Sequence, residues 1–226
     1  MMVPPQVAEG IRNLAVWVIP LILSITLHEA AHGMVAWKLG DDTAKRLGRV
    51  SANPANHIDP FGTILLPGML LLMGGGVMFG WAKPVPVNFG RLQPPRMGMI
   101  LVAMAGPMAN ILLAIASALL IYAVGLLPVS GQTFALQNLK NSVEINLVLA
   151  VFNMLPLPPL DGGRVLVGLL PRPLAYQVAQ LERYSVIILL VGLFLLPLVG
   201  FNPFAWLVGR PAVWLEGLLF HLTGFI

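Results

Sequence analysis

An apolar run near the start of the chain carries three ionisable side chains within five residues. Its flanks, residues 14–27 and 33–39, are almost wholly apolar, and His28, Glu29 and His32 stand between them. Ionisable groups inside a membrane span cost on the order of 2.5–3.5 kcal/mol each on insertion scales, so a cluster of three calls for a compensating role. This run therefore constrains both the fold and the chemistry of the chain.

The spacing of the two histidines favours binding of one shared metal ion. Residues four apart on an α-helix are separated by about 40° and about 6 Å of rise, so His28 and His32 point the same way. This arrangement suits two nitrogen ligands of one tetrahedral zinc ion, with Glu29 beside them as a general base. The alternative is a chance five-residue match on a helix whose histidines only bond a neighbour.

The composition indicates a membrane protein. Only 10% of the 226 residues are charged, against about 25% in a soluble domain, and the mean hydropathy is +0.86. The absence of cysteine excludes disulfides, thiolate metal sites and a cysteine nucleophile. The net charge of +4 comes without a basic run, so we expect no nucleic-acid partner. We predict one integral membrane domain, 1–226, with a core at about 12–165 and accessory C-terminal helices at about 181–226.

Apolar runs long enough to cross a hydrocarbon core of roughly 30 Å divide the chain. Clear candidates lie at about 12–38, 97–124, 143–160 and 184–199, and a fifth at about 204–225 is interrupted by Arg210-Pro211. Polar connectors are expected at 39–60, 82–96, 125–142 and 161–183. The first basic residue is Arg12, and the run after it carries the histidines, so a cleaved signal peptide is not expected. The predicted fold class is an all-α polytopic membrane protein with about five to six transmembrane helices.

Run 63–80 is ambiguous, because it contains Pro67 and the triplet Gly74-Gly75-Gly76. If it crosses the membrane, the basic residues are nearly balanced between the two faces. If it re-enters, ten Lys and Arg residues share one face, against two or three on the other. The positive-inside rule favours the re-entrant segment and makes the basic face cytoplasmic. That arrangement also places the histidines and residues near 161 in the same leaflet.

A third metal ligand is predicted at Asp161. The segment 153–163 reads NMLPLPPLDGG, and three prolines in four positions cannot continue a regular helix. Unwinding there lets a carboxylate turn inward, while Gly162 and Gly163 permit close backbone approach. The alternative is an ordinary helix end at the membrane surface, with Asp161 capping the next helix.

The two segments together resemble the site-2 protease family of intramembrane zinc metallopeptidases. The resemblance covers roughly residues 20–165, and it implies one Zn²⁺ held by His28, His32 and Asp161, with Glu29 as catalytic base. It also implies that Asn153 binds the substrate backbone. Residues 106–110 (GPMAN) and 80–88 (GWAKPVPVN) look like further family elements, the second at the place of a small membrane-associated β element. The resemblance departs from the family pattern in one respect, because we expect no PDZ or other soluble regulatory domain within these 226 residues.

The implied function is an intramembrane endopeptidase that cuts in or near transmembrane segments of membrane proteins. The implied partners are a transmembrane protein substrate and the lipid bilayer, and the implied location is a bacterial inner membrane, with the site nearer the cytoplasmic face. The sequence leaves the oligomeric state open. The alternatives are a membrane zinc or proton transporter, and an inactive protease-like protein that binds membrane partners. A transporter would more naturally show repeated halves, which this sequence does not.

Four further residues carry weaker signals. Val85 and Val87 alternate with Pro86 and suit an edge strand that pairs with an unwound substrate, although an irregular loop fits the sequence equally. Asn110 lies within a predicted span, so we expect it to contact another helix or the metal pocket. His57 lies in a turn-rich connector, as an extra ligand or gate or, more simply, as a loop histidine held by turn hydrogen bonds.

Overall fold

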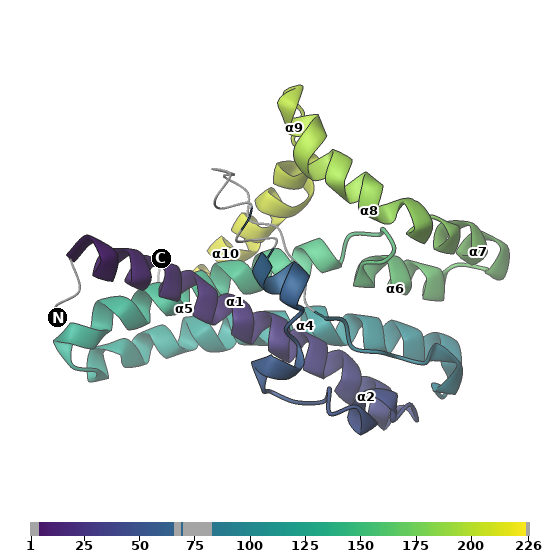
Figure 1. Cartoon of the computed structure of the whole chain (residues 1–226), viewed down its shortest axis with the longest axis horizontal. Helices are drawn as coiled ribbons and strands as arrows, with labels where there is room; N and C mark the ends of the chain where they lie inside the picture. Colours follow the sequence, from purple (N-terminus) through teal and green to yellow (C-terminus); the bar gives the residue numbers. More distant parts are fainter. Residues whose placement is uncertain (1–4, 66–68, 70–82, 225–226) are drawn as a thin grey trace.

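The computed structural model describes residues 5–65, 69 and 83–224, and these residues are mainly helical and form no β-strand. The long helices lie beside one another, and a bent arm of later helices rises from them (Figure 1). The α-helices are α1 (Pro5–Lys38), α2 (Thr43–Arg46), α4 (Pro95–Ile121), α5 (Val129–Asn153), α6 (Asp161–Leu169), α7 (Arg172–Gln180), α8 (Glu182–Leu190), α9 (Leu196–Leu198) and α10 (Arg210–Leu222). The 3-10 turns are η1 (Pro54–Asn56), η3 (Phe89–Arg91) and η4 (Tyr122–Leu126), and the π-helical turns are η2 (Pro60–Leu65), η5 (Val191–Leu195) and η6 (Ala205–Gly209).

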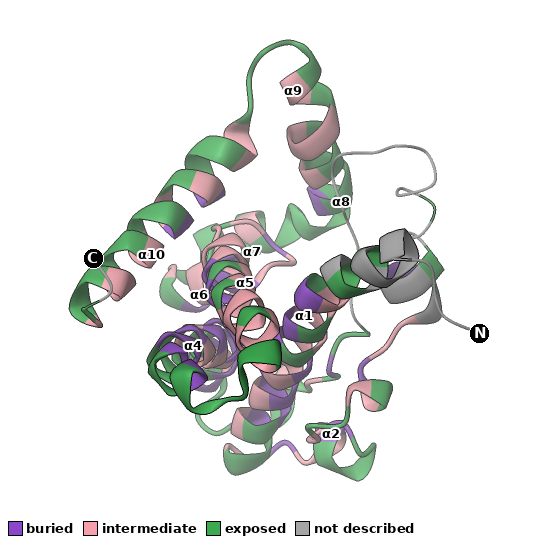
Figure 2. Ribbon diagram, turned by 90° about the vertical axis from the view of Figure 1, so that its left-hand side faces the viewer, coloured by how far each residue is buried: buried purple, intermediate pink, exposed green. Residues whose placement is uncertain are grey.

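Helices α1, α4 and α5 pack against one another and form the centre of the fold. Their buried residues face inward in the view along the bundle (Figure 2). One apolar cluster joins α4, α5 and α10 through small or short side chains: Ala114, Ala118, Val143, Leu147 and Ala212. Small side chains let helix backbones approach closely, which is the usual way that helices associate where lipid removes the hydrophobic driving force.

Two helices are long and apolar enough to cross a membrane, spanning Leu14–Lys38 and Pro95–Leu126. A third candidate is the pair Arg172–Gln180 and Glu182–Leu198, which is bent by 49°. Many large apolar side chains on these helices are exposed, as expected for surfaces that face lipid. Among the described residues this gives two or three candidates, so the five to six crossings stay a prediction. Most of run 63–80 lies outside the described residues.

Two predicted connectors were wrong. Residues 129–142 are the first part of α5, and residues 161–183 form α6, α7 and the start of α8. The polar side chains of α5 suggest a loop, but the helix itself satisfies some of them. The Asn138 amide donates to the Phe134 carbonyl, and the Asn141 amide donates to the Val16 carbonyl of α1. Tertiary contacts therefore override the local polarity of this segment.

The predicted proline break is confirmed. Helix α5 ends at Asn153, and α6 begins at Asp161 after a turn that contains the three prolines. A Cβ on Gly162 would lie 2.2 Å from the Met154 carbonyl oxygen, and one on Gly163 would lie 2.2 Å from the Pro158 nitrogen. Only glycine fits this close approach, which folds the start of α6 back onto the end of α5 and fixes Asp161.

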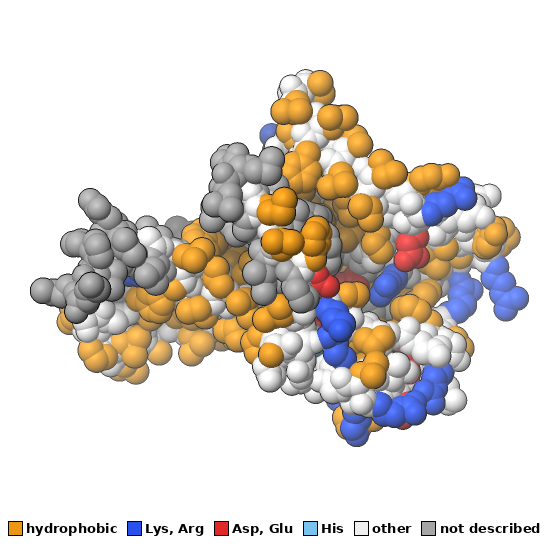
Figure 3. All heavy atoms as spheres, in the orientation of Figure 1, with side chains coloured by type: hydrophobic (Ala, Val, Ile, Leu, Met, Phe, Trp, Pro, Cys, Tyr) orange, Lys and Arg blue, Asp and Glu red, His pale blue; other side chains and the backbone are white. Residues whose placement is uncertain are grey.

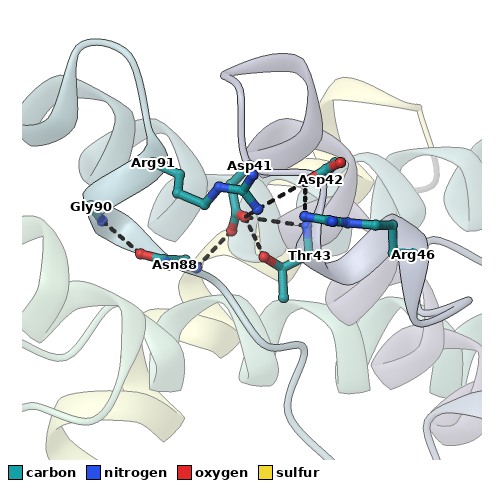
Figure 4. Close-up of polar contacts among 7 residues, drawn as sticks. All are labelled: Asp41, Asp42, Thr43, Arg46, Asn88, Gly90 and Arg91. Carbon is teal, nitrogen blue, oxygen red and sulfur yellow. Dashed lines mark hydrogen bonds and ion pairs between the residues drawn. The ribbon is translucent and has the colours of Figure 1, made fainter.

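A polar cluster at the end of α1 fixes the chain where it leaves the first candidate span (Figure 4). The buried Asp41 carboxylate accepts hydrogen bonds from the Thr43 N–H, the Thr43 hydroxyl and, at 2.6 Å, the Asn88 N–H. Burial raises the pKa of Asp41, but these hydrogen bonds and the Arg91 guanidinium outweigh it and hold the pKa below its ordinary value. The carboxylate thus joins the loop after α1 to the segment before α4.

We expect Asp41→Asn to destabilise the protein, because hydrogen bonds to a charged group contribute about 1.5–3 kcal/mol. A carboxyl whose folded pKa is depressed contributes stability that is fully present above about pH 4 and is lost as the pH falls through the folded pKa. The thermal unfolding midpoint of the wild-type protein in detergent should therefore fall in acid, and that of Asp41→Asn should fall less.

Asp42→Asn is the matched control. Asp42 lies beside Asp41, but its side chain is 42% exposed and pairs with Arg46 and Arg91 at the surface. Exposed ion pairs of this kind contribute about 0–1 kcal/mol. Equal midpoints for the two variants would contradict the role given to Asp41.

Candidate metal centre

Three side chains from two distant segments converge inside the bundle. His28 and His32 come from α1 and Asp161 from the first residue of α6, and all three are buried. The Nε2 atoms of the two histidines lie 3.1 Å apart. The Asp161 Oδ2 lies 3.2 Å from His28 Nε2 and 3.3 Å from His32 Nε2. Among the described residues, His28, His32 and Asp161 form a group of side chains that could hold a metal ion.

The hydrogen bonds of the two imidazoles turn their Nε2 lone pairs toward this point. His32 Nδ1 lies 2.7 Å from the Val102 carbonyl oxygen, which can only accept, so Nδ1 carries the proton. His28 Nδ1 lies 2.5 Å from the Asn110 Oδ1 and donates to it in the same way. In the neutral tautomers, each Nε2 is then an acceptor that faces the other and the carboxylate.

Three mutually facing acceptors repel one another unless a cation lies among them. The buried Asp161 Oδ2 accepts no hydrogen bond from any described residue, as expected of an atom that binds a cation. Ligand atoms at about 2.0–2.1 Å from a tetrahedral zinc ion lie about 3.3–3.4 Å apart. The observed separations and the His-His-Asp donor set therefore fit Zn²⁺, and two nitrogens with one carboxylate leave a position for water.

Helix α4 supports the site along one face. Val102, Gly106 and Asn110 are four residues apart, so they share that face. Val102 and Asn110 bind the two histidines, and Gly106 lies between them. A Cβ on Gly106 would lie 2.4 Å from His32 Nε2 and 2.5 Å from His28 Nε2. Glycine thus leaves the space in which the ligand atoms meet.

Glu29 lies next to the histidines on α1 and is half-buried. Its Oε2 accepts a 2.8 Å hydrogen bond from the Val85 N–H. The carboxylate is therefore held by a backbone donor from residues 83–88, which we call the strap. This contact brings the strap beside the candidate metal centre.

The strap has no regular secondary structure and pairs with no strand among the described residues, so the predicted β element is not found at 83–88, while residues 80–82 lie outside the described residues. The buried Arg49 holds one end by donating to the carbonyls of Lys83 and Pro84. The Lys83 N–H donates to the His57 carbonyl at 3.0 Å, and Asp41 holds the other end through Asn88. The strap is thus fixed at both ends and in the middle.

The remaining predicted site residues lie outside the group of His28, His32 and Asp161. Asn153 ends α5, and its amide donates to the Leu149 carbonyl, 3.0 Å away in the same helix. The His57 side chain is buried, bonds the Ser51 carbonyl through Nε2 and lies outside the three-residue group. Val85 is buried and Val87 half-buried on the strap. Asn110 is at the pocket, as expected for a polar residue within a span.

The sequence reasoning missed Arg49 and Asn146. Arg49 stands in a polar loop, where a basic residue suggests an anchor at the membrane surface. Nothing in the local sequence shows that its guanidinium turns inward to the carbonyls of Asn56, Lys83 and Pro84. Asn146 is a polar residue within the apolar run 145–152, which is the same signal that indicated Asn110. It donates nothing to the metal group directly, but its Oδ1 accepts from the Asn110 amide at 2.7 Å.

Fold and site together indicate a membrane-associated protein with a candidate zinc site, and comparison with known proteins identifies its class. The model of "Peptidase family M50" matches residues 16–145 and 132–199. "Putative zinc metalloprotease YwhC" of Bacillus subtilis (strain 168) is 44% identical over 185 residues, which cover 80% of each chain. "Putative zinc metalloprotease Rip2" of Mycobacterium tuberculosis (strain H37Rv) is 30% identical over 205 residues, 90% of this chain and 72% of that protein. No solved structure matches the chain significantly.

The chain therefore belongs to peptidase family M50, the site-2 proteases. The predicted resemblance is confirmed, and with it the class of enzyme, a zinc metallopeptidase.

We expect Gly106→Ala to weaken zinc binding at least about tenfold, because the added methyl group would overlap both Nε2 atoms. Zinc content after purification and zinc affinity in a chelator competition would measure the effect. Gly131→Ala, on α5, is the matched control, since a Cβ there meets nothing within 4 Å. Full zinc occupancy in Gly106→Ala would show that the ligands meet elsewhere.

Proposed function

We propose that this protein is an intramembrane zinc endopeptidase that hydrolyses peptide bonds in or near transmembrane segments of membrane proteins. The observation that carries the proposal is the convergence of Asp161 with His28 and His32, which lie with Glu29 on a helix apolar enough to span a bilayer. In this role the first three residues hold zinc and Glu29 is the catalytic base.

The residues divide the chemistry between them. Zinc, when bound, supplies Lewis acidity and makes water nucleophilic at neutral pH. Glu29 accepts the proton of the attacking water at its carboxylate and delivers it to the nitrogen of the leaving amine. The Val85 N–H keeps the Glu29 carboxylate oriented in the absence of substrate. Asn153, at the break after α5, donates from its amide to the substrate backbone near the scissile bond.

The strap is proposed to bind the unwound substrate. In this role residues 85–87 are extended alongside the substrate. Alternate residues of an extended chain direct their N–H groups to the same side, so Val87 would present its N–H on the side where Val85 meets Glu29. Pro84 and Pro86 remove donors only from the opposite side. The Val87 N–H has no partner among the described residues, so it is available to a substrate strand.

The proposed orientation places the basic end of the molecule in the cytoplasm. Most Lys and Arg side chains on the visible face gather near α2, α6 and α7, while apolar side chains predominate on the described parts of the long helices and of the bent arm (Figures 1 and 3). The positive-inside rule supports this orientation in a bacterial inner membrane. Together with five to six crossings and a re-entrant segment near 63–80, it gives one domain with its site nearer the cytoplasmic face.

Glu29→Gln should strongly reduce proteolysis and retain zinc. Glutamine keeps an oxygen for the Val85 N–H but cannot accept the proton of water, so we expect kcat to fall about 10²–10⁴-fold. Purified protein, a helical membrane substrate and a zinc determination measure both effects. Glu144→Gln is the matched control, because Glu144 is exposed on α5. Zinc flux into vesicles that survives Glu29→Gln, without any cleavage by the wild-type protein, would support a transporter instead.

Val87→Pro tests the strap. It removes the free N–H, and one hydrogen bond of about 1–1.5 kcal/mol corresponds to a loss of about tenfold in kcat/KM. Val87→Ala trims the side chain and keeps the N–H, so it controls for packing against the buried cluster of Ala36, Leu92 and Val102. Zinc affinity should be unchanged in both variants. Equal kcat/KM values in the two would remove the strap from substrate binding.

A further inference from the structure

A chain of buried amides leads away from the metal centre between α4 and α5. Asn110 and Asn146 are 0% and 1% exposed. The Asn110 Oδ1 meets His28 Nδ1 at 2.5 Å, and its Nδ2 donates to the Asn146 Oδ1 at 2.7 Å. The Asn146 Nδ2 then donates to the Ser142 carbonyl at 2.8 Å. The Asn146 Nδ2 also lies 3.3 Å from the Ser142 hydroxyl, which in turn lies 2.8 Å from the Ser117 hydroxyl.

The directions of the hydrogen bonds from His28 through the two amides follow from the Ser142 carbonyl at the end of the chain. The Ser142 carbonyl can only accept, so Asn146 turns its amide nitrogen toward that carbonyl and its oxygen toward Asn110. Asn110 must then donate with its own nitrogen, which leaves its oxygen facing His28. The proton of the neutral imidazole is thereby held on Nδ1, and the lone pair of Nε2 points to the metal centre.

We propose that Asn110 and Asn146 are positioning residues that fix the tautomer and ring orientation of His28 for zinc. The inference rests on the proposed metal-binding role of His28. His32 needs no such chain, because its Nδ1 donates directly to a backbone carbonyl, that of Val102. His28 has a side-chain acceptor, and that acceptor has defined polarity only while Asn146 orients it.

A purely structural role for these amides makes a different prediction. Polar side chains that only join two membrane helices contribute about 0.6 kcal/mol on average, and their removal does not alter a site through a third residue. A group that orients a metal-binding histidine typically changes metal affinity 10–100-fold when it is removed. Zinc affinity, measured without substrate, therefore separates the two roles.

The experiment compares four variants by chelator competition for zinc and by thermal unfolding in detergent. Asn110→Leu, which has no acceptor for His28, should bind zinc about 10–100-fold more weakly. Asn110→Asp, which keeps an acceptor, should restore affinity to within about threefold of the wild-type protein. Asn146→Leu should weaken zinc binding, and the double variant Asn110→Leu/Asn146→Leu should bind no more weakly than Asn110→Leu alone, because both changes act on one interaction.

Asn141→Ala is the matched control. Asn141 also lies on α5 and joins it to α1 through the Val16 carbonyl at 2.9 Å, without entering the amide chain. It should alter the unfolding midpoint and leave zinc affinity unchanged. If Asn110→Leu does not fold, the comparison of Asn146→Leu with Asn141→Ala still decides the question.

Unchanged zinc affinity in Asn110→Leu or Asn146→Leu, or additive losses in the double variant, would overturn the inference, and so would failure of Asn110→Asp to restore binding. The proposed function fails separately, if the wild-type protein binds zinc and cleaves no membrane substrate.

Discussion

The fold depends on three acceptor atoms, two imidazole nitrogens and one carboxylate oxygen, that face one another away from water. Without a cation this contact is unfavourable, and in a low-dielectric interior the repulsion is stronger than it would be at a surface. The hydrogen bonds of the two imidazoles nevertheless keep these three atoms facing one another. They hold the imidazole protons on the outward nitrogens, so the energy of metal binding is available to join α1 and α6, which are far apart in sequence.

The proline break supplies the carboxylate at the correct depth. A continuous helix would carry residue 161 about 12 Å beyond Asn153 along the helix axis. The turn instead folds α6 back, and the two glycines after Asp161 lie against backbone atoms of the turn. Helix α6 is then held against α4, where Gly168 contacts Ile100 and Arg96 donates to the carbonyls of Gly168 and Leu170. The turn of the backbone thus brings the Asp161 carboxylate to the histidines, which a longer side chain on a continuous helix could not do.

The chemistry of the site could be predicted from the sequence more fully than its support. The histidine spacing and the proline-rich break are local patterns, so His28, His32 and Asp161 could be grouped before any coordinates. The helix at 129–142 could not be predicted, because its polar side chains are satisfied by α1 and by the helix itself. Arg49 and Asn146 act through contacts with residues 34–36 positions away, which no local pattern contains. Alternation at Val85 and Val87 predicted an extended backbone, but a partner strand is a property of the whole fold.

Helix α4 has a consequence for how the enzyme can vary. Its inner face supplies a carbonyl at Val102, an empty volume at Gly106 and an amide at Asn110, and each acts on a different part of the histidine pair. Rotating or sliding the helix by a fraction of a turn would misplace all three at once. The opposite face exposes the side chains of Leu101, Met104, Met108 and Leu112. Adaptation to a thicker or thinner bilayer can therefore proceed on one side of a single helix while the opposite side stays fixed.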